Sequence, residues 1–405
     1  MLAVAAMATT RVRTGIIGTG FMGRVHLEAV RRLGVVDVVA VAGSRVDKAR
    51  QLADTFGIAD ATGDYRTLLT KPDLDAVHIC TPNVQHYAMA AAALGAGKHV
   101  VCEKPLTMTS TEAADLVARA SATRLRHATC HNLRYYPMVQ QLRRLCESGE
   151  LGELLIAQGT YSQDWLLYDT DWNWRVESNE AGALRAMGDI GSHWCDMMEH
   201  VTGLRIASLA ADLATFHTTR KQPLQSVETF AGKVQAATSR REKAVDTEDF
   251  GAVLFRTSAR ARGAFTVSQV SAGCKNRLAI EIYGTKAAAS WNQERPDELW
   301  LGRRDGASGL ALKDPSLMTP AAATYADLPG GHSEGYDDTF KQLFRRFYQS
   351  VLDPEMPVEY PQFTDGLRQM QLLDAVRASH ERRAWVDVAP TKVHDGHDGH
   401  DGSME

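Results

Sequence analysis

Lys104 is the first candidate catalytic residue because of its position in the chain. It belongs to Glu103-Lys104-Pro105, directly after the apolar, strand-like residues 99–102. The carboxyl ends of parallel strands are where doubly wound α/β sheets bind ligands, and Pro105 restricts the backbone beside the lysine. An ammonium group held there could stabilise the alkoxide that develops when an alcohol is oxidised. The alternative is a surface lysine in a polar turn, but the position after the strand favours the catalytic role.

Asp189 and His193 form a second candidate pair, in Gly188-Asp189-Ile190-Gly191-Ser192-His193. If this segment is helical, Asp189, His193, Asp196 and His200 lie on one stripe. A carboxylate one turn from an imidazole can orient the ring and raise its basicity, and neutral histidine is a suitable base near pH 7. The stripe could equally be a helix face whose polar groups are satisfied by hydrogen bonds. A metal site is not expected, because no third and fourth ligands cluster with these residues.

A glycine-rich turn near the start of the chain predicts a dinucleotide site. The apolar run at 12–17 leads directly into Gly18-Thr19-Gly20-Phe21-Met22-Gly23, and an amphipathic stretch follows. In this pattern Gly18 permits a tight turn, Gly20 lets the backbone approach a pyrophosphate, and Gly23 allows close packing of helix against strand. The phosphates would bind the N–H groups at the helix N-terminus. We therefore expect NAD or NADP as cofactor, with Phe21 and Met22 also in its binding site.

Two later segments are expected to complete the cofactor site. NAD enzymes usually have an acid after the second strand for the ribose 2′-hydroxyl, but here the chain reads Gly43-Ser44-Arg45, and we expect the next acid, Asp47, to cap a helix. Ser44 and Arg45 could bind a 2′-phosphate, which favours NADP; the alternative is a solvated arginine in a turn. The remaining predicted cofactor-binding residues follow the fourth and fifth strands and are Thr81, Pro82, Asn83, His86, Glu103 and Lys104.

Substrate-binding candidates come mainly from aromatic and polar residues of the second half. Trp165, Trp172 and Trp174 lie among aspartates and beside Arg175, and aromatic faces interleaved with polar groups suit a sugar ring. The alternative is that these aromatic side chains only cover a core. The candidate substrate-binding residues are Lys104, Tyr161, Trp165, Trp174, Arg175, Asp189, His193, His332 and Tyr336.

The pattern of elements changes near residue 132. Before it, strand-like runs at 12–17, 38–41, 76–81, 99–102 and 127–130 alternate with helical stretches, which predicts a Rossmann fold with a doubly wound parallel sheet. After it, alternating runs at 154–162, 206–216, 250–256, 261–270 and 278–283 follow one another with few helices between them. They predict an α/β domain with an open, mostly antiparallel sheet. Residues 221–247 and 303–333 indicate long connections, and helices at 336–351 and 363–380 with a short strand at 384–388 close the fold.

A length of 405 residues favours two domains. We expect a disordered start at 1–10, a dinucleotide-binding domain at 11–132, a substrate-binding and oligomerisation domain at 133–389, and a disordered tail at 390–405. The tail repeats His-Asp-Gly three times, and for this composition a disordered polar segment is favoured over a metal site.

Composition excludes several classes of partner. The net charge is −4, so no basic surface for nucleic acid or anionic membranes is expected. No apolar run reaches the length of a membrane span, and the apolar residues 1–7 have no preceding basic residue, as an export signal would. The six cysteines form no C-x-x-C pair, which favours buried, reduced thiols. These features predict a cytoplasmic enzyme.

With these motifs placed, the chain resembles the glucose–fructose oxidoreductase / inositol dehydrogenase (Gfo/Idh/MocA) family from about residue 18 to 388. The resemblance is carried by the glycine turn, Thr81-Pro82-Asn83 with His86, Glu103-Lys104-Pro105, Gly188-Asp189-x-Gly191-x-His193 and Tyr283-Gly284-Thr285-Lys286. It implies a Rossmann domain followed by an open, largely antiparallel domain whose sheet forms contacts in a dimer or tetramer. It also implies a catalytic lysine, aspartate and histidine, carried here by Lys104, Asp189 and His193. The missing acid after the second strand departs from the pattern and leaves the choice between NAD and NADP open.

Three functions are compatible with these residues. The first is a sugar or polyol dehydrogenase in which His193 takes the hydroxyl proton, Lys104 stabilises the alkoxide, and Asp189 orients His193 or binds the substrate. The second is a redox-neutral glycosidase or epimerase that oxidises its substrate transiently and recycles the bound nicotinamide. The third is a non-catalytic dinucleotide-binding relative, against which the joint presence of the three residues argues.

Overall fold

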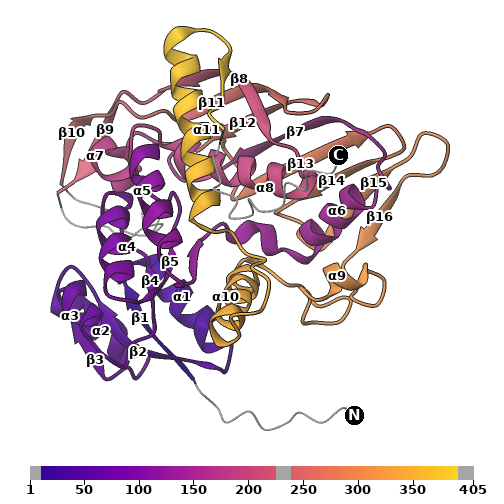
Figure 1. The fold of residues 1–405 in the computed structure, drawn as a ribbon. Helices are drawn as coiled ribbons and strands as arrows, with labels where there is room; N and C mark the ends of the chain where they lie inside the picture. Colours follow the sequence, from indigo (N-terminus) through magenta and orange to yellow (C-terminus); the bar gives the residue numbers. More distant parts are fainter. Residues whose placement is uncertain (1–10, 225–238, 391–405) are drawn as a thin grey trace, which may run out of the picture.

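The first third of the chain forms a parallel sheet covered by helices (Figure 1). The protein is described by a computed structural model that covers residues 11–224 and 239–390. The sheet has the strand order β3-β2-β1-β4-β5-β6, and all its pairs are parallel. Its strands are β1 (Val12–Ile17), β2 (Val36–Ala42), β3 (Asp60–Thr62), β4 (Ala76–Ile79), β5 (His99–Cys102) and β6 (His127–Thr129). The predicted Rossmann fold is confirmed.

The helices of this half lie between its strands and cover both faces of the sheet. They are α1 (Phe21–Arg31), α2 (Val46–Thr55), α3 (Tyr65–Leu69), α4 (His86–Gly95), which follows the short η1 (Asn83–Gln85), and α5 (Ser110–Ser121). Because both faces are covered, β4 is buried along its whole length and is apolar except at His78. The strand order reverses between β1 and β4, and this switch point is where such sheets bind dinucleotides.

The rest of the chain forms a nine-stranded sheet in the order β16-β15-β14-β13-β7-β12-β11-β8-β17. All neighbouring pairs are antiparallel except β7 with β12, so the predicted mostly antiparallel sheet is confirmed. The strands are β7 (Leu154–Ser162), β8 (Ile206–Ala214), β11 (Phe250–Thr257), β12 (Arg262–Ser268), β13 (Arg277–Gly284), β14 (Ala288–Asn292), β15 (Glu298–Gly302), β16 (Gly309–Leu312) and β17 (Val386–Asp387). Helices α6 (Pro137–Glu147), α8 (Ser192–Thr202) and α11 (Phe363–Arg382) pack on this sheet.

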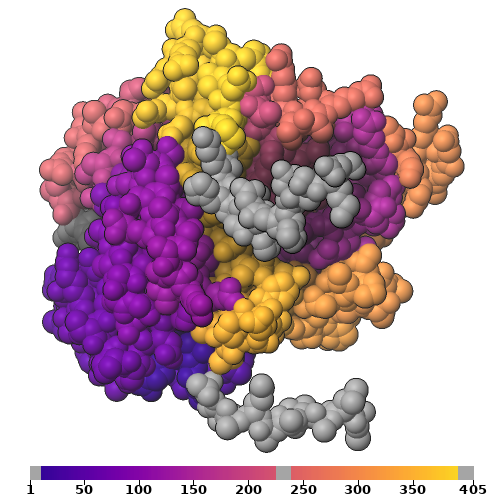
Figure 2. Space-filling model, in the orientation of Figure 1, coloured from indigo at the N-terminus to yellow at the C-terminus, as the bar shows by residue number. Residues whose placement is uncertain are grey.

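Two C-terminal helices join the halves. Helix α10 (Tyr336–Leu352) lies against the parallel sheet, where Phe340, Leu343, Phe344 and Phe347 are buried in one cluster with residues of β1, α1, β4 and β5. Helix α11 contacts both α5 and β8. In Figure 2 the yellow and orange C-terminal segment accordingly lies directly against the indigo-to-purple first half. The last part of the chain therefore completes the core of the Rossmann half, and the domain limits 11–132 and 133–389 stay predictions.

The predicted connections were wrong in part. Residues 219–223 and 240–244 pair as the antiparallel strands β9 (Thr219–Pro223) and β10 (Arg240–Ala244), and the 303–333 stretch contains β16 and α9 (Pro320–Ala323). Strands β14 and β15 were also not predicted. These strands are short and β10 is largely charged, so backbone pairing rather than an apolar repeat identifies them. The predictions for residues 1–10 and for the His-Asp-Gly tail lie outside the described residues.

The remaining short elements are η2 (Asn132–Tyr135), η3 (Trp174–Val176), α7 (Ser178–Ala181) and η4 (Met187–Gly191), a single π-helical turn that runs directly into α8. All six cysteines are free, as predicted; four of them are buried, whereas Cys146 and Cys274 are half-buried. Within residues 11–224 and 239–390, no helix has the length and apolar character needed to cross a bilayer.

Helix α10 provides a test of how the halves depend on each other. Phe344 is fully buried between α10 and the parallel sheet, so Phe344→Ala is expected to lower the free energy of unfolding by about 3–5 kcal/mol. Leu352→Ala, a control at the half-exposed end of the same helix, is expected to cost less than about 1 kcal/mol. Urea denaturation followed by circular dichroism measures both. Equal losses for the two variants would contradict the packing role of α10.

Candidate active site

The glycine turn after β1 has the shape that a dinucleotide needs. Gly18 has φ +120°, and a Cβ on Gly23 would lie 2.0 Å from the carbonyl oxygen of Gly18. Both positions therefore require glycine. Gly20, the residue before α1, is different, because a Cβ there would meet no atom within 4 Å. The open space beside Gly20 at a helix N-terminus fits the pyrophosphate of NAD or NADP, with Phe21 and Met22 in the first turn of α1.

The loops after β4 and β5 are tied to each other through His86. This histidine is fully buried at the start of α4, and its ring nitrogens lie 2.9 Å from the carbonyl oxygen of Thr81 and 2.8 Å from that of Pro105. Burial lowers the pKa of His86. In the same region Pro82 precedes η1, and the side-chain amide of Asn83 donates to the carbonyl oxygen of Ala181 in α7, at 2.8 Å. These contacts fix the loop that carries Lys104 and connect it to the second half.

The central contact of the site joins Lys104 to Asp189. The Lys104 ammonium donates to the carboxylate Oδ1 of Asp189 at 2.8 Å and to its backbone carbonyl at 2.7 Å. Lys104 follows β5 of the parallel sheet, whereas Asp189 lies in the π-helical turn η4 that leads into α8. The two motifs singled out in the sequence, 85 residues apart, therefore meet between the two sheets.

Asp189 has partners for both its oxygens. Arg175 in η3 donates to Oδ1 at 3.1 Å, and Gln269, directly after β12, donates to Oδ2 at 2.9 Å. Burial alone would raise the pKa of Asp189, but the Lys104 ammonium and the Arg175 guanidinium outweigh it and hold the pKa well below its usual range. Asp189 is therefore a carboxylate that accepts hydrogen bonds from Lys104, Arg175 and Gln269. Among the described contacts it has no hydrogen bond with His193.

His193 lies beside this cluster at the start of α8. It is 7% exposed, and its Nδ1 has no hydrogen-bond partner among the described residues. Its ring packs edge-on against His131 at 5.6 Å and lies 6.4 Å from the ring of Tyr161. Burial and the positive charge of Lys104 hold the pKa of His193 well below its usual value, so the ring is neutral near pH 7.

The two other polar residues of the predicted helical stripe have partners elsewhere. Asp196 accepts from Arg134 at 2.7 Å, and His200 lies 3.1 Å from the amide of Gln140. For these two residues the alternative holds, a helix face satisfied by hydrogen bonds, and the partners come from η2 and α6.

The substrate-binding candidates divide into two groups. Tyr161 on β7 is buried beside His193 and donates to Asn276 at 2.8 Å, and Arg175 contacts Asp189 and packs over the ring of Trp174 at 4.5 Å. Burial, with a smaller contribution from nearby Glu103, raises the pKa of the Tyr336 hydroxyl at the start of α10 well above its usual value. The structure brings these residues toward the Lys104 cluster.

The second group has no described contact with that cluster. Trp165 packs near the small core formed by Leu166, Val176 and Val245 and donates to Gln163 at 2.8 Å. His332 is exposed, and its ring contacts the carbonyl oxygen of Gly330 at 3.3 Å in its own turn. The substrate-binding roles of Trp165 and His332 stay predictions.

The residues after β2 are exposed. Ser44 is exposed to solvent. Arg45 donates two hydrogen bonds to the Asp47 carboxylate, with Nε–Oδ1 at 3.0 Å and Nη2–Oδ2 at 2.6 Å. Arg45 is the residue before α2, so the expectation that Asp47 caps this helix was wrong; Asp47 lies within the first turn. A carboxylate therefore already neutralises the arginine that could bind a 2′-phosphate.

Comparisons with known proteins agree with this geometry. The family model described as an oxidoreductase family with an NAD-binding Rossmann fold matches residues 12–130, and the GFO/IDH/MocA C-terminal domain model matches residues 139–290. The chain belongs to the Gfo/Idh/MocA family of oxidoreductases. The resemblance noted in the sequence is confirmed, and with it an NAD-binding Rossmann domain.

Several members of the family are similar over nearly their full length. The levoglucosan dehydrogenase of Pseudarthrobacter phenanthrenivorans is 31% identical over 93% of this chain and 98% of its own. A solved levoglucosan dehydrogenase in complex with NADH and L-sorbose has a TM-score of 0.84 at 28% identity, with 94% of this chain and 99% of that chain covered. An inositol dehydrogenase homologue with NAD⁺ from Azotobacter vinelandii has a TM-score of 0.81 at 25% identity, with 96% and 100% covered.

Sequence reasoning missed two residues of this Gfo/Idh/MocA site. Gln269 is fully buried and holds Asp189 Oδ2, and His131 is buried beside His193 with neither ring nitrogen hydrogen-bonded among the described residues. His131 follows β6, at the same edge of the parallel sheet as Lys104. The position of His131 after a parallel strand could have indicated a site residue from the sequence. The position of Gln269 after β12 gives no such indication.

Gly20 allows the cofactor site to be tested without disturbing the fold. Gly20→Ala adds a methyl group where no protein atom lies within 4 Å and where we expect the pyrophosphate. The thermal midpoint should be unchanged, and the affinity for NADH should fall at least about tenfold. Gly95→Ala at the end of α4, where added atoms also meet nothing, should leave NADH binding unaltered. Titration of NADH fluorescence measures both, and unchanged binding in Gly20→Ala would exclude this position for the phosphates.

Proposed function

We propose that the protein is a dehydrogenase that oxidises a secondary alcohol of a sugar or anhydrosugar with NAD. The observation that carries this proposal is the meeting of Lys104, Asp189 and the neutral His193 beside the carboxyl ends of the parallel strands. An ammonium group, its counter-ion and a neutral base are the groups that proton removal from an alcohol requires.

Each residue has a distinct part in this proposal. His193 takes the hydroxyl proton at Nε2, since its Nδ1 is buried. The Lys104 ammonium hydrogen-bonds the alkoxide oxygen that forms, and its positive charge favours alkoxide over alcohol. Asp189 keeps the ammonium in place through Oδ1 and the backbone carbonyl. Bound NAD supplies the hydride acceptor, and the Gly18–Gly23 turn with Thr81, Pro82, Asn83, His86 and Glu103 is proposed to hold it.

The proposed substrate is a compact pyranose or anhydrosugar. The similar proteins reported above are levoglucosan dehydrogenases and an inositol dehydrogenase homologue. Tyr161, Trp174, Arg175 and Tyr336 are proposed to line the substrate side of the cluster, where aromatic faces and hydrogen-bonding groups suit a sugar ring. We propose NAD rather than NADP because Asp47 already pairs with Arg45 and opposes a second negative charge.

We further propose a cytoplasmic homo-oligomer assembled through the nine-stranded sheet, with residues 11–132 binding the dinucleotide. By the strand register, Ile156, Leu254, Trp300 and Leu310 lie on one face of this sheet, and each is at least 40% exposed. An exposed apolar face of this kind is typical of an interface. Light scattering of the purified protein tests this, and a monomer would contradict it.

A substrate screen tests the proposed reaction. Purified protein is incubated with pyranoses, levoglucosan and inositols, each with NAD or NADP, and reduced nicotinamide is followed by absorbance. Net reduction equal to the amount of ketone product is expected, with NAD preferred. Cleavage or epimerisation with solvent deuterium entering the sugar, without net reduction, would instead identify the redox-neutral reaction.

Substitution of the proposed catalytic residues tests the mechanism. Lys104→Met and His193→Ala should each lower kcat by about 10²–10⁴-fold, because an alkoxide stabiliser or a base is lost, while NADH affinity changes little. His200→Asn, on the same helix as His193 but bonded to Gln140, is the matched control and should retain most activity. Unchanged turnover in both Lys104→Met and His193→Ala would overturn the assignment.

A further inference from the structure

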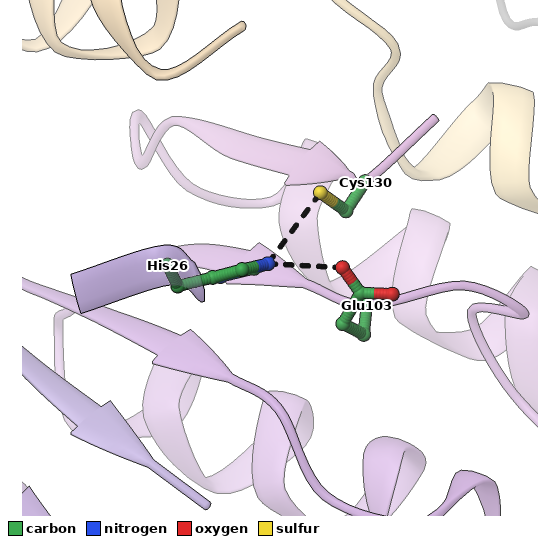
Figure 3. Close-up of side chains that lie close together, drawn as sticks. All are labelled: His26, Glu103 and Cys130. Atoms are coloured by element: carbon green, nitrogen blue, oxygen red, sulfur yellow. Dashed lines mark hydrogen bonds and ion pairs between the residues drawn. The ribbon is translucent and has the colours of Figure 1, made fainter. Parts of the chain in front are cut away.

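Four polar side chains form a chain of contacts inside the Rossmann half, outside the cluster described above. The hydroxyl of Tyr348 in α10 lies 2.7 Å from Nε2 of His78 in β4. Nδ1 of His78 lies 3.0 Å from Nδ1 of His26 in α1, and Nε2 of His26 lies 2.9 Å from Oε1 of Glu103. Figure 3 shows the last of these contacts, with the His26 ring aimed at the carboxylate.

This chain of hydrogen-bonded side chains is shielded from water. Tyr348, His78 and His26 are fully buried, and Glu103 is 6% exposed. The ring of Phe344 packs against both histidines, at 4.8 and 4.7 Å. In such surroundings each ring nitrogen must be satisfied by its neighbour in the chain, because an unpaired buried donor or acceptor is costly.

For a neutral His26 ring, donor counting assigns a position to each proton. A carboxylate only accepts hydrogen bonds, so Nε2 of His26 carries its proton and donates to Glu103. In a neutral ring Nδ1 of His26 must then accept, which requires N–H at Nδ1 of His78. Nε2 of His78 accepts in turn from the Tyr348 hydroxyl. All three hydrogen bonds therefore point from α10 toward Glu103.

The ionisation of Glu103 and His78 is compatible with this direction. Burial raises the pKa of Glu103, but the hydrogen bond from His26 and the electrostatic effects of His26 and Lys104 outweigh it, so the pKa stays below its usual value and the group is a carboxylate. Burial, together with the neighbouring His26, lowers the pKa of His78 far below its usual value, so this ring is neutral.

The hydrogen-bond chain ends at the backbone N–H of Lys104. While Oε1 of Glu103 accepts from His26, its Oε2 accepts from the backbone N–H of Lys104 at 3.3 Å. The Glu103 carboxylate therefore links the buried histidines to the residue whose ammonium contacts Asp189.

We infer that Tyr348, His78 and His26 form a one-way hydrogen-bond chain that holds the Glu103 carboxylate against the Lys104 backbone. His26 and His78 are then positioning residues, through which α10 orients the lysine. The consequence for turnover rests on the proposed function of Lys104, whereas the proton positions do not.

A metal ion is the competing use of these side chains. His26, Glu103 and Cys130 place one donor atom each within 4.8 Å of one another, with the Cys130 sulfur 3.7 Å from Nε2 of His26 (Figure 3). A metal would take the lone pair of Nε2, whereas the chain requires a proton on this nitrogen. Burial and the charge of Glu103 raise the pKa of the Cys130 thiol well above its usual value, which favours the chain. The two arrangements exclude each other.

Histidine tautomers test the chain directly in the full-length protein. With ¹⁵N-labelled histidine, nuclear magnetic resonance should show protons on Nε2 of His26 and on Nδ1 of His78. Tyr348→Phe should shift the Nε2 signal of His78. Tyr360→Phe removes another buried hydroxyl of the same apolar cluster, one bonded to Ser350, and should leave both rings unchanged. Protons on the opposite nitrogens, or one equivalent of zinc in metal analysis of the protein purified without chelator, would overturn the inference.

Turnover tests the positioning role. His26→Leu removes the donor to Glu103, and kcat/KM should fall at least about tenfold, as for loss of one hydrogen bond to a charged group. His26→Gln keeps an N–H donor near the same place and should restore most of that loss, although both variants break the contact with His78. Equal losses in the two variants would overturn the positioning role. If Lys104→Met keeps its turnover while the tautomers are as expected, the proposed function fails and the chain itself stands.

Discussion

The contact between Lys104 and Asp189 is the interaction on which the site depends. It joins the loop after β5 of the parallel sheet to the π-helical turn that begins α8 under the antiparallel sheet. Both side chains are largely buried, at 11% and 16% exposure. An ion pair removed from water is stable only if its remaining lone pairs and protons find partners. Arg175, Gln269 and the Asp189 carbonyl supply those partners, and they come from parts of the chain that only the complete fold brings together.

The elements between the halves follow from this requirement. Two sheets that share an ion pair must keep a fixed separation, and the described structure fixes it with apolar and polar contacts. Helix α10 inserts a row of phenylalanines against the parallel sheet, and α11 packs on both α5 and β8. Closer to the site, Asn83 bonds the backbone of Ala181 across the same boundary. The C-terminal helices therefore hold the two sheets at the separation that the contact between Lys104 and Asp189 needs.

The sequence predicts those parts of the site that arise from local patterns. Gly18, Gly20 and Gly23 follow an apolar strand, and Lys104 follows another, so strand ends alone indicate their roles. The partner of Asp189 could not be obtained in this way. Helical spacing suggested His193, but Asp189 bonds Lys104, Arg175 and Gln269, because charged donors from other elements lie nearer its oxygens. The strands of the β13–β16 edge illustrate the same limit: β13 alternates over eight residues and was predicted, whereas β14 and β15 have five residues each and were not. Local pattern identifies a strand when its residues alternate over several positions, as in β13, or form a nearly continuous apolar run, as in β5.

The charges of the site suit the proposed reaction, in which an alcohol oxygen becomes negative. Lys104 and Arg175 both contact the single carboxylate of Asp189, so these three groups together carry one net positive charge. That charge acts in a partly buried place where electrostatic interactions are stronger than in water. It also holds the pKa of the neighbouring His193 down, after the effect of burial. A ring kept neutral can accept a proton, and an uncompensated positive charge can stabilise the alkoxide left behind. Had Asp189 paired with His193 instead, it would have favoured the protonated ring and left Lys104 without its counter-ion. In the proposed reaction, the observed pairing leaves His193 free to act as the base and Lys104 free to stabilise the alkoxide.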